Sequence, residues 1–107
     1  MLLPQNSLIA PEKIAGYLLA PREQDDKSGL LALLGYTAEH VARLEADIRA
    51  QLLSREASET VQTAYGRKFI IRGTLTGPNG RSLLVKSVWM REKATGITKF
   101  ITLYPNQ

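Results

Sequence analysis

The spacing of apolar residues changes halfway along the chain. In the first half they recur three or four residues apart, which is the period of one helix face. Pro11 suits a first helical position, and Ile14, Tyr17 and Leu18 follow at helical spacing. Pro21 then ends the segment, because proline has no backbone N–H for the next hydrogen bond. The pattern predicts a short helix that begins at Pro11.

A second short helix is predicted around a leucine cluster at residues 30–34. Either Asp25 or Asp26 is a suitable N-cap for it, since a carboxylate accepts hydrogen bonds from the first turn. Gly35 follows the last leucine and is expected to end this helix, because glycine tolerates the left-handed conformation found there.

The longest helix is expected to begin with Thr37 as its N-cap and to run to about Ser54. Its apolar residues return at the same face with each turn, so one side is predicted to pack on the rest of the protein. These residues are Val41, Leu44, Ile48 and Leu52.

The second half of the chain has the period and composition of β-strands. Segments rich in β-branched and aromatic residues alternate with short turns that contain glycine. The turn "GPNG" at residues 77–80 places Pro and Asn at its centre. The strands are predicted at residues 60–65, 68–76, 81–92 and 97–104.

This order of elements predicts an α+β fold. Short turns between consecutive strands give a four-stranded antiparallel meander, and the two or three N-terminal helices must cover one of its faces. We expect one domain over residues 1–107, with a helical half at 1–55 and a sheet half at 59–105.

Strand alternation divides the sheet residues between two faces. One set is expected under the helices, where Trp89 contributes a large buried area and Ser87 lies beside it. That set is Phe69, Ile71, Leu75, Val85, Ser87, Trp89, Ile101 and Leu103. The other set mixes cations, hydroxyls and large apolar groups, which is typical of a binding surface rather than a solvated face. It comprises Ile70, Arg72, Thr74, Leu84, Lys86, Val88, Met90, Phe100, Thr102 and Tyr104.

The charge is distributed unevenly between the halves. The net charge of the chain is +4, but residues 1–59 carry −3 and residues 60–107 carry +7. Such a split suggests an anionic partner for the sheet half. The alternative is that acidic helices only offset a basic sheet.

Composition excludes several kinds of site. The chain has no cysteine, so it has no disulfide, thiolate metal site or cysteine nucleophile. Its one histidine, His40, is expected to be a solvated residue near a helix start, and no metal or cofactor is predicted. The N-terminal residues lack the features of a signal peptide, and no apolar run is long enough to span a bilayer. A cytoplasmic location is therefore expected.

Cations on the open face are the leading candidates for phosphate contacts. Arg72 can hold a phosphate with two hydrogen bonds, and Lys86 adds a point charge. Thr102 and Tyr104 are possible hydroxyl donors, while Phe100 or Tyr104 offers an aromatic ring for a base. More cations lie near the strand ends and would attract an anionic partner from a distance. These are Arg67, Lys68, Arg81, Arg91, Lys93 and Lys99.

Four stretches of the chain together resemble a family of small bacterial proteins of unknown function. They are "LPQNSLIAPEKIAGYLLAP", "DKSGLLALLGYT", "YGRKFIIRGTLTGPNGRSLLVKSVWM" and "KFITLYP". The family occurs in cyanobacteria among other bacteria, often beside a gene for a small partner protein. Its helices-then-meander plan is similar to the barnase/EndoU/colicin/RelE-type ribonuclease toxin fold.

The resemblance implies metal-independent RNA cleavage on the open sheet face. In that chemistry the ribose 2′-hydroxyl attacks the adjacent phosphate, and basic side chains stabilise the resulting anion. By this analogy the catalytic residues are Lys86, Arg72 and Thr102, with Lys27 reaching in from the helices. The alternative is a non-catalytic module that binds a small acidic protein, as in a toxin–antitoxin pair, or a second copy of itself.

Overall fold

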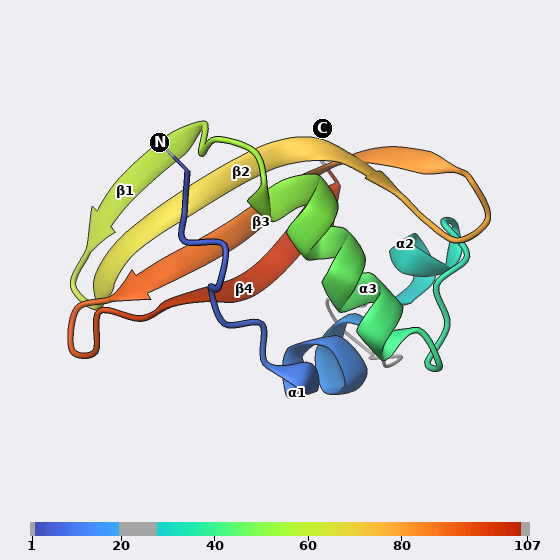
Figure 1. Cartoon of the computed structure of the whole chain (residues 1–107), viewed down its shortest axis with the longest axis horizontal. Coiled ribbons are helices and arrows are strands. Elements are labelled where there is room, and N and C mark those ends of the chain that lie inside the picture. The colour runs from blue at the N-terminus through green and yellow to red at the C-terminus, as the bar shows by residue number, and fades with distance from the viewer. Residues whose placement is uncertain (1, 20–27, 106–107) are drawn as a thin grey trace.

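The computed structural model describes residues 2–19 and 28–105 of the chain. Three short helices precede a four-stranded antiparallel sheet, which confirms the predicted α+β fold (Figure 1). The first and third helices each widen into a π-helical last turn, labelled η. The helical elements are α1 (Pro11–Lys13), η1 (Ile14–Leu18), α2 (Ser28–Ala32), α3 (Val41–Ile48) and η2 (Arg49–Leu53).

The strands follow one another across the sheet in chain order, as expected of a meander. All three neighbouring pairs are antiparallel. The strands are β1 (Glu59–Thr63), β2 (Gly66–Thr76), β3 (Ser82–Glu92) and β4 (Thr98–Pro105). The β2–β3 hairpin is the longest, and α2 lies near its turn (Figure 1).

The start of the longest helix differs from the prediction. Its N-cap is His40 rather than Thr37. Thr37 instead opens a turn, in which its backbone N–H donates to Nδ1 of His40 at 2.9 Å and its carbonyl accepts from the His40 N–H. The Asp25 and Asp26 caps proposed for the second helix lie outside the described residues.

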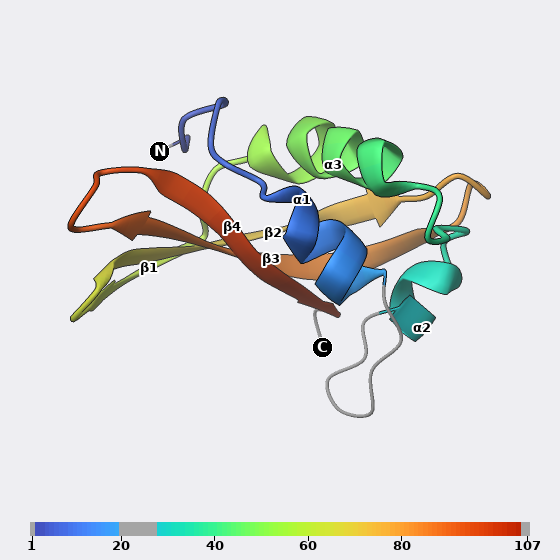
Figure 2. The ribbon, with the colours of Figure 1, turned by 90° about the horizontal axis from the view of Figure 1, so that it is seen from below.

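Helix α3 and its continuation η2 cover the sheet face that carries Trp89 (Figure 2). The expected core residues of β2 and β3 are buried there, among them Phe69, Ile71 and Val85. Gly73 permits this close packing, because a Cβ at its position would lie 2.7 Å from the side chain of Arg55. The opposite sheet face, which the alternation predicted to be open, is not covered by α3 and η2.

Polar groups in this core are satisfied. Ser87 is fully buried, and its hydroxyl donates to the carbonyl of Ile71 at 3.0 Å. The same oxygen accepts a 2.9 Å hydrogen bond from the indole nitrogen of Trp89. Ser87 thus anchors the large Trp89 ring, which supports its assignment to the core.

Strand β4 contains a bulge, and because of it Phe100 lies on the other sheet face from the one predicted. Val88 pairs with Thr102 but Trp89 pairs with Phe100, so Ile101 is an extra residue on β4. A bulge reverses the alternation beyond it. Phe100 consequently points under the helices, where it is 1% exposed and packs edge-on against Trp89 with ring centroids 5.3 Å apart. The prediction of an exposed Phe100 was wrong.

The N-terminal segment runs beside the outer edge of the sheet. Leu8 forms a parallel bridge with Lys99, through backbone hydrogen bonds of 2.8 Å to Thr98 and Phe100. This pairing covers part of the β4 edge, which would otherwise present unpaired backbone groups. Among the described residues, no helix has the length and apolar character needed to cross a membrane.

Candidate functional site

A row of three candidate side chains crosses the open face. Arg72 on β2 lies directly opposite Lys86 on β3, and Lys86 lies directly opposite Tyr104 on β4. Residues at paired positions point to the same side of a sheet and lie within about 5.5 Å at their Cβ atoms. The sheet therefore brings together three residues that span 32 positions of the chain, from 72 to 104.

Two like charges placed opposite one another weaken a sheet unless something compensates them. Part of the compensation comes from β1. Arg72 donates to Oγ of Ser58 at 2.8 Å and forms a 3.3 Å ion pair with Glu59. The pair is partly exposed, so water and ligands reach it. These two contacts restrain the guanidinium at this position of the open face.

The ammonium of Lys86 lies over the ring of Tyr104, 5.6 Å from its centroid. Such a cation–π contact restrains a long lysine side chain without neutralising its charge. Tyr104 itself is 38% exposed. This edge of the row thus offers a charge and an exposed aromatic ring side by side, which is the combination that holds a nucleotide phosphate and its base.

A second row of cations lies nearer the β1–β2 turn. Lys68 pairs with Met90, and Met90 pairs with Lys99, so both lysines are on the open face. Lys99 forms a 3.3 Å ion pair with Glu92. Together with the Arg72 row, these residues give the open face four cations and two described carboxylates, Glu59 and Glu92.

The centre of the open face is less accessible than expected. Thr102 is only 6% exposed, and its hydroxyl donates to that of Tyr17 in η1 at 3.4 Å. Its neighbour Val88 is 7% exposed. The expectation that Thr102 presents a free hydroxyl on this face was therefore wrong, because the first helix reaches it.

The other candidate residues are distributed over the molecule. Arg67 lies on the helix-facing side, at the sheet end beyond the helices. Arg81 is exposed at the β2–β3 turn, which is at the other end of the β2–β3 hairpin from Arg67. Lys27 lies outside the described residues. Of the residues proposed to contact RNA, the open face collects Lys68, Lys99 and Tyr104.

One member of the site, Glu59, was missed from the sequence. It was counted in the net charge of residues 1–59, and β1 was expected to begin one residue later, at residue 60. The observed register puts Glu59 opposite Ile70, on the open face and beside Arg72. One signal was available in the sequence. Glu59 is an acidic residue at the start of the first strand, and the strands that follow it are rich in basic residues.

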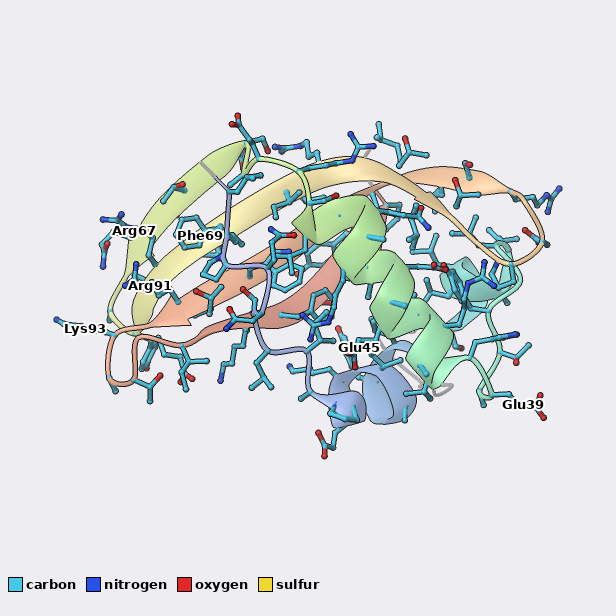
Figure 3. All side chains as sticks on the ribbon, in the orientation of Figure 1. Glu39, Glu45, Arg67, Phe69, Arg91 and Lys93 are labelled. Atoms are coloured by element: carbon cyan, nitrogen blue, oxygen red, sulfur yellow. The ribbon has the colours of Figure 1, made fainter. Side chains whose placement is uncertain are left out.

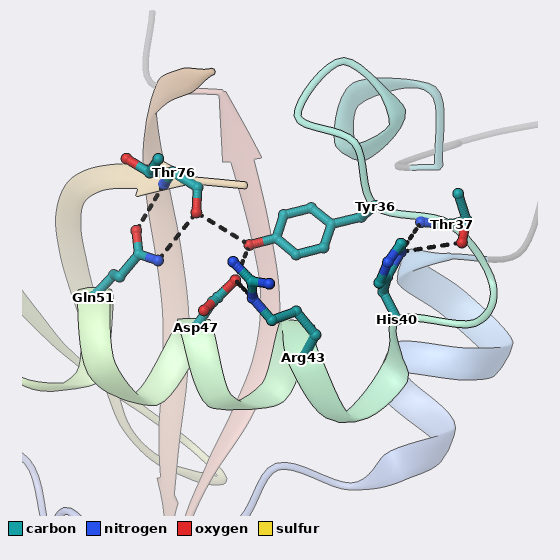
Figure 4. A network of polar contacts seen from close by, with 7 residues as sticks. All are labelled: Tyr36, Thr37, His40, Arg43, Asp47, Gln51 and Thr76. Atoms are coloured by element: carbon teal, nitrogen blue, oxygen red, sulfur yellow. Dashed lines mark hydrogen bonds and ion pairs between the residues drawn. The ribbon is translucent and has the colours of Figure 1, made fainter. Parts of the chain in front are cut away.

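The histidine lies away from this face, in a polar network at the start of α3 (Figure 4). Nδ1 of His40 bonds to Thr37, and its ring meets Tyr36 edge-on. Tyr36 is 2% exposed and donates a 2.5 Å hydrogen bond to Asp47, which also accepts from Arg43 at 3.0 Å. Burial, and then the Asp47 carboxylate, raise the pKa of Tyr36 well above its usual value. The network ties the helices together.

No group of histidine, aspartate and glutamate side chains in the described part of the chain is arranged to hold a metal ion.

Comparisons with known proteins agree with this description. A family model described as "Domain of unknown function (DUF6883)" matches residues 4–107. A chain of the contact-dependent growth inhibition toxin–immunity protein complex from Klebsiella pneumoniae 342 is similar in structure, with a TM-score of 0.61 and 21% identity. The similarity covers 94% of this chain and 100% of that one, so the two share a fold. No curated protein matches the sequence.

Proposed function

We propose that this chain, which belongs to the DUF6883 family, is a toxin-fold protein that binds RNA on its open sheet face and cleaves it without a metal ion. The observation that carries the proposal is the Arg72–Lys86–Tyr104 row with Glu59 at its end. Two further observations support it. Residues 60–107 carry +7, and a solved structure with the same fold belongs to a toxin–immunity protein complex.

Each part of the row has a role in this reaction. The carboxylate of Glu59 accepts the proton of the ribose 2′-hydroxyl, as a general base does. The 2′-oxygen then attacks the neighbouring phosphorus, and a 2′,3′-cyclic phosphate forms as the 5′-oxygen leaves with a proton from water. Arg72 and Lys86 stabilise the extra negative charge on the phosphorane, and the Tyr104 ring supports a base. Thr102 has no role, since it is buried against Tyr17.

Cleavage of a defined RNA in the presence of EDTA tests the proposal. Glu59→Gln removes the base but keeps the side chain's size, so the cleavage rate is expected to fall about 10²–10⁴-fold. Arg72→Ala combined with Lys86→Ala is expected to lower both cleavage and RNA affinity, because it removes the charges that hold the phosphate. Products should end in a cyclic phosphate.

The matched control is Lys13→Ala with Arg43→Ala, which removes two cations from the helices and should leave cleavage unchanged. Equal cleavage by the wild type and the Arg72/Lys86 variant would assign the activity elsewhere. If the wild type binds RNA but leaves it intact, the catalytic part of the proposal is wrong.

A second candidate is a non-catalytic module that binds an acidic protein or a second copy of itself. Leu84, on the open face beside the cation row, is 48% exposed, and a large exposed apolar side chain suits a protein interface. The neighbouring gene product is the natural partner to test. Salt-sensitive binding of that protein, without any affinity for RNA, would favour this function over the first.

A further inference from the structure

The end of the sheet at the β1–β2 and β3–β4 turns carries a second group of cations. Arg67 and Arg91 are directly opposite one another on β2 and β3, and Lys93 follows in the next turn. All three gather at the same end of the molecule (Figure 3). The two arginines share the helix-facing side with Phe69 and Trp89, but they lie beyond the helices and are exposed. They are therefore separate from the Arg72–Lys86 row.

This arginine pair has little charge compensation from the residues that the structure describes. No carboxylate in residues 2–19 or 28–105 forms an ion pair with Arg67, Arg91 or Lys93. Glu92 is close by, but it is paired with Lys99. A directly opposed pair of like charges costs stability in a sheet. An external anion would remove that cost, because guanidinium groups bind oxyanions with two parallel hydrogen bonds.

The arrangement around the arginines is concave. Arg67, Arg91 and Lys93 line a hollow of about 330 Å³, together with Gln62, Gly66, Glu92 and Gly96. The residues paired with the two arginines on the neighbouring strands are also polar. Gln62 on β1 pairs with Arg67, and Thr98 on β4 pairs with Arg91. Nε of Arg67 donates to Oε1 of Gln62 at 3.4 Å, which orients the guanidinium. Two guanidinium groups and one ammonium group thus line one space that is large enough for a phosphate group.

A second hollow adjoins the first and supplies an aromatic ring. Its volume is about 450 Å³, and Tyr65 and Ala64 are part of its lining. It shares Glu92 and Lys93 with the first hollow. Tyr65 is 82% exposed, and its carbonyl accepts a 3.0 Å hydrogen bond from the Lys93 backbone. The backbone contact places an exposed aromatic ring beside a cationic hollow, and such a ring can stack on a base.

We propose that this end of the sheet is a nucleoside phosphate site, in which Arg67 and Arg91 hold the phosphate and Tyr65 stacks on the base. The phosphate belongs either to a free nucleotide or to the end of a nucleic acid strand. Arg67 and Arg91 are on the opposite side of the sheet from the row proposed to act on RNA. Binding at this end is therefore expected to be separable from the proposed cleavage.

Titration with AMP, inorganic phosphate, adenosine and a 5′-phosphorylated trinucleotide tests this site. Backbone amide and arginine Nε–Hε signals in NMR spectra would report binding. AMP is expected to shift the signals of Arg67 and Arg91, and Arg67→Gln with Arg91→Gln should weaken its binding at least about tenfold. Tyr65→Ala should weaken AMP binding and leave inorganic phosphate binding unchanged. Tighter binding of the trinucleotide than of AMP would identify a strand end as the ligand.

The control variant is Lys13→Gln with Arg43→Gln, which removes the same charge from the helices and should bind AMP as the wild type does. A melting curve of each variant checks folding, and the shifts in the wild-type protein test the site without any substitution. Failure of AMP to bind, or shifts confined to the open face, would overturn the proposal whatever the outcome of the cleavage assay.

Discussion

Individual side chains decide how tightly the helices are held to one another and to the sheet. Tyr36 is almost fully buried, and its hydroxyl reaches both Asp47 and the carbonyl of Thr76 (Figure 4). Four residues after Asp47, Gln51 bonds to the backbone N–H and carbonyl of Thr76 at 2.7 and 3.1 Å. These contacts connect α3 and η2 to the end of β2, in addition to the apolar packing.

Alkaline pH should destabilise the protein through Tyr36. Its pKa is raised in the folded chain, mainly by burial and secondarily by Asp47, whereas the unfolded chain has a tyrosine pKa near 10. The unfolded state thus loses the proton first, so the free energy of unfolding falls as pH rises above about 10. Below that pH the contribution is fully present.

Urea denaturation between pH 8 and 12 measures this effect. Tyr36→Phe should cost about 1–3 kcal/mol at pH 8, because Asp47 loses a hydrogen bond. The difference between wild type and variant should then shrink as pH increases. A constant difference across this range would show that Tyr36 does not titrate differently in the two states.

At the scale of elements, the turns and the bulge fix the geometry of both candidate sites. The bulge at Ile101 turns Phe100 inward and Lys99 outward, so it adds a cation to the open face and an aromatic ring to the core. Gly66 brings the β1–β2 turn against β3. Its φ of +151° suits glycine, and a Cβ there would lie 2.1 Å from the carbonyl oxygen of Arg91.

Gly66→Ala is accordingly expected to destabilise the protein by about 2–4 kcal/mol, from backbone strain and the clash with β3. The same change should displace Arg67 and weaken nucleotide binding at this end of the sheet. Gly16→Ala is the matched control, since a Cβ at Gly16 meets nothing within 4 Å and alanine favours a helix. Thermal melting of the two variants compares them, and equal melting temperatures would contradict the role given to Gly66.

For the whole molecule, the important feature is where the charge lies. The basic sheet half places four cations on the open face and a further three at one end. The described carboxylates of the open face, Glu59 and Glu92, each pair with one cation and leave an excess of positive charge. Such a surface attracts polyanions, and its affinity depends on salt through the release of counterions.

RNA binding is therefore expected to weaken steeply with salt. For single strands the slope of log K against log salt is about −0.7 per phosphate contact, so two to four contacts give about −1.4 to −2.8. Arg72→Gln with Lys86→Gln should make the slope shallower by about 1.4. Fluorescence anisotropy of a labelled RNA over a range of salt concentrations measures it. An unchanged slope would place the RNA elsewhere on the protein.

Most of the fold could be predicted from residue spacing because local periodicity and turn residues determine it. The helix period before Ser54, the strand alternation after it and the "GPNG" turn led to the observed order of elements. Thr37 failed as a cap because the first turn of α3 is closed by His40 instead. Phe100 failed because an extra residue in a strand leaves no clear mark in a single sequence.

The candidate site was predictable only in part. Arg72, Lys86 and Tyr104 share a parity that strand alternation makes visible, and short turns fix their neighbours. Glu59 depended on the exact first residue of β1, and the burial of Thr102 depended on where η1 packs. Neither of these is a local property.

The sequence by itself determined the order of helices and strands, the separation of charge and which residues of β2 and β3 share a face with Trp89, because these follow from hydrophobic period and composition. Only the tertiary structure decided which residues meet. Strand register put Glu59 beside Arg72, a bulge exchanged the faces of Lys99 and Phe100, and two distant turns brought Arg67, Arg91 and Tyr65 to one end. Those contacts join residues far apart in the chain, so they depend on the packing of the whole sheet.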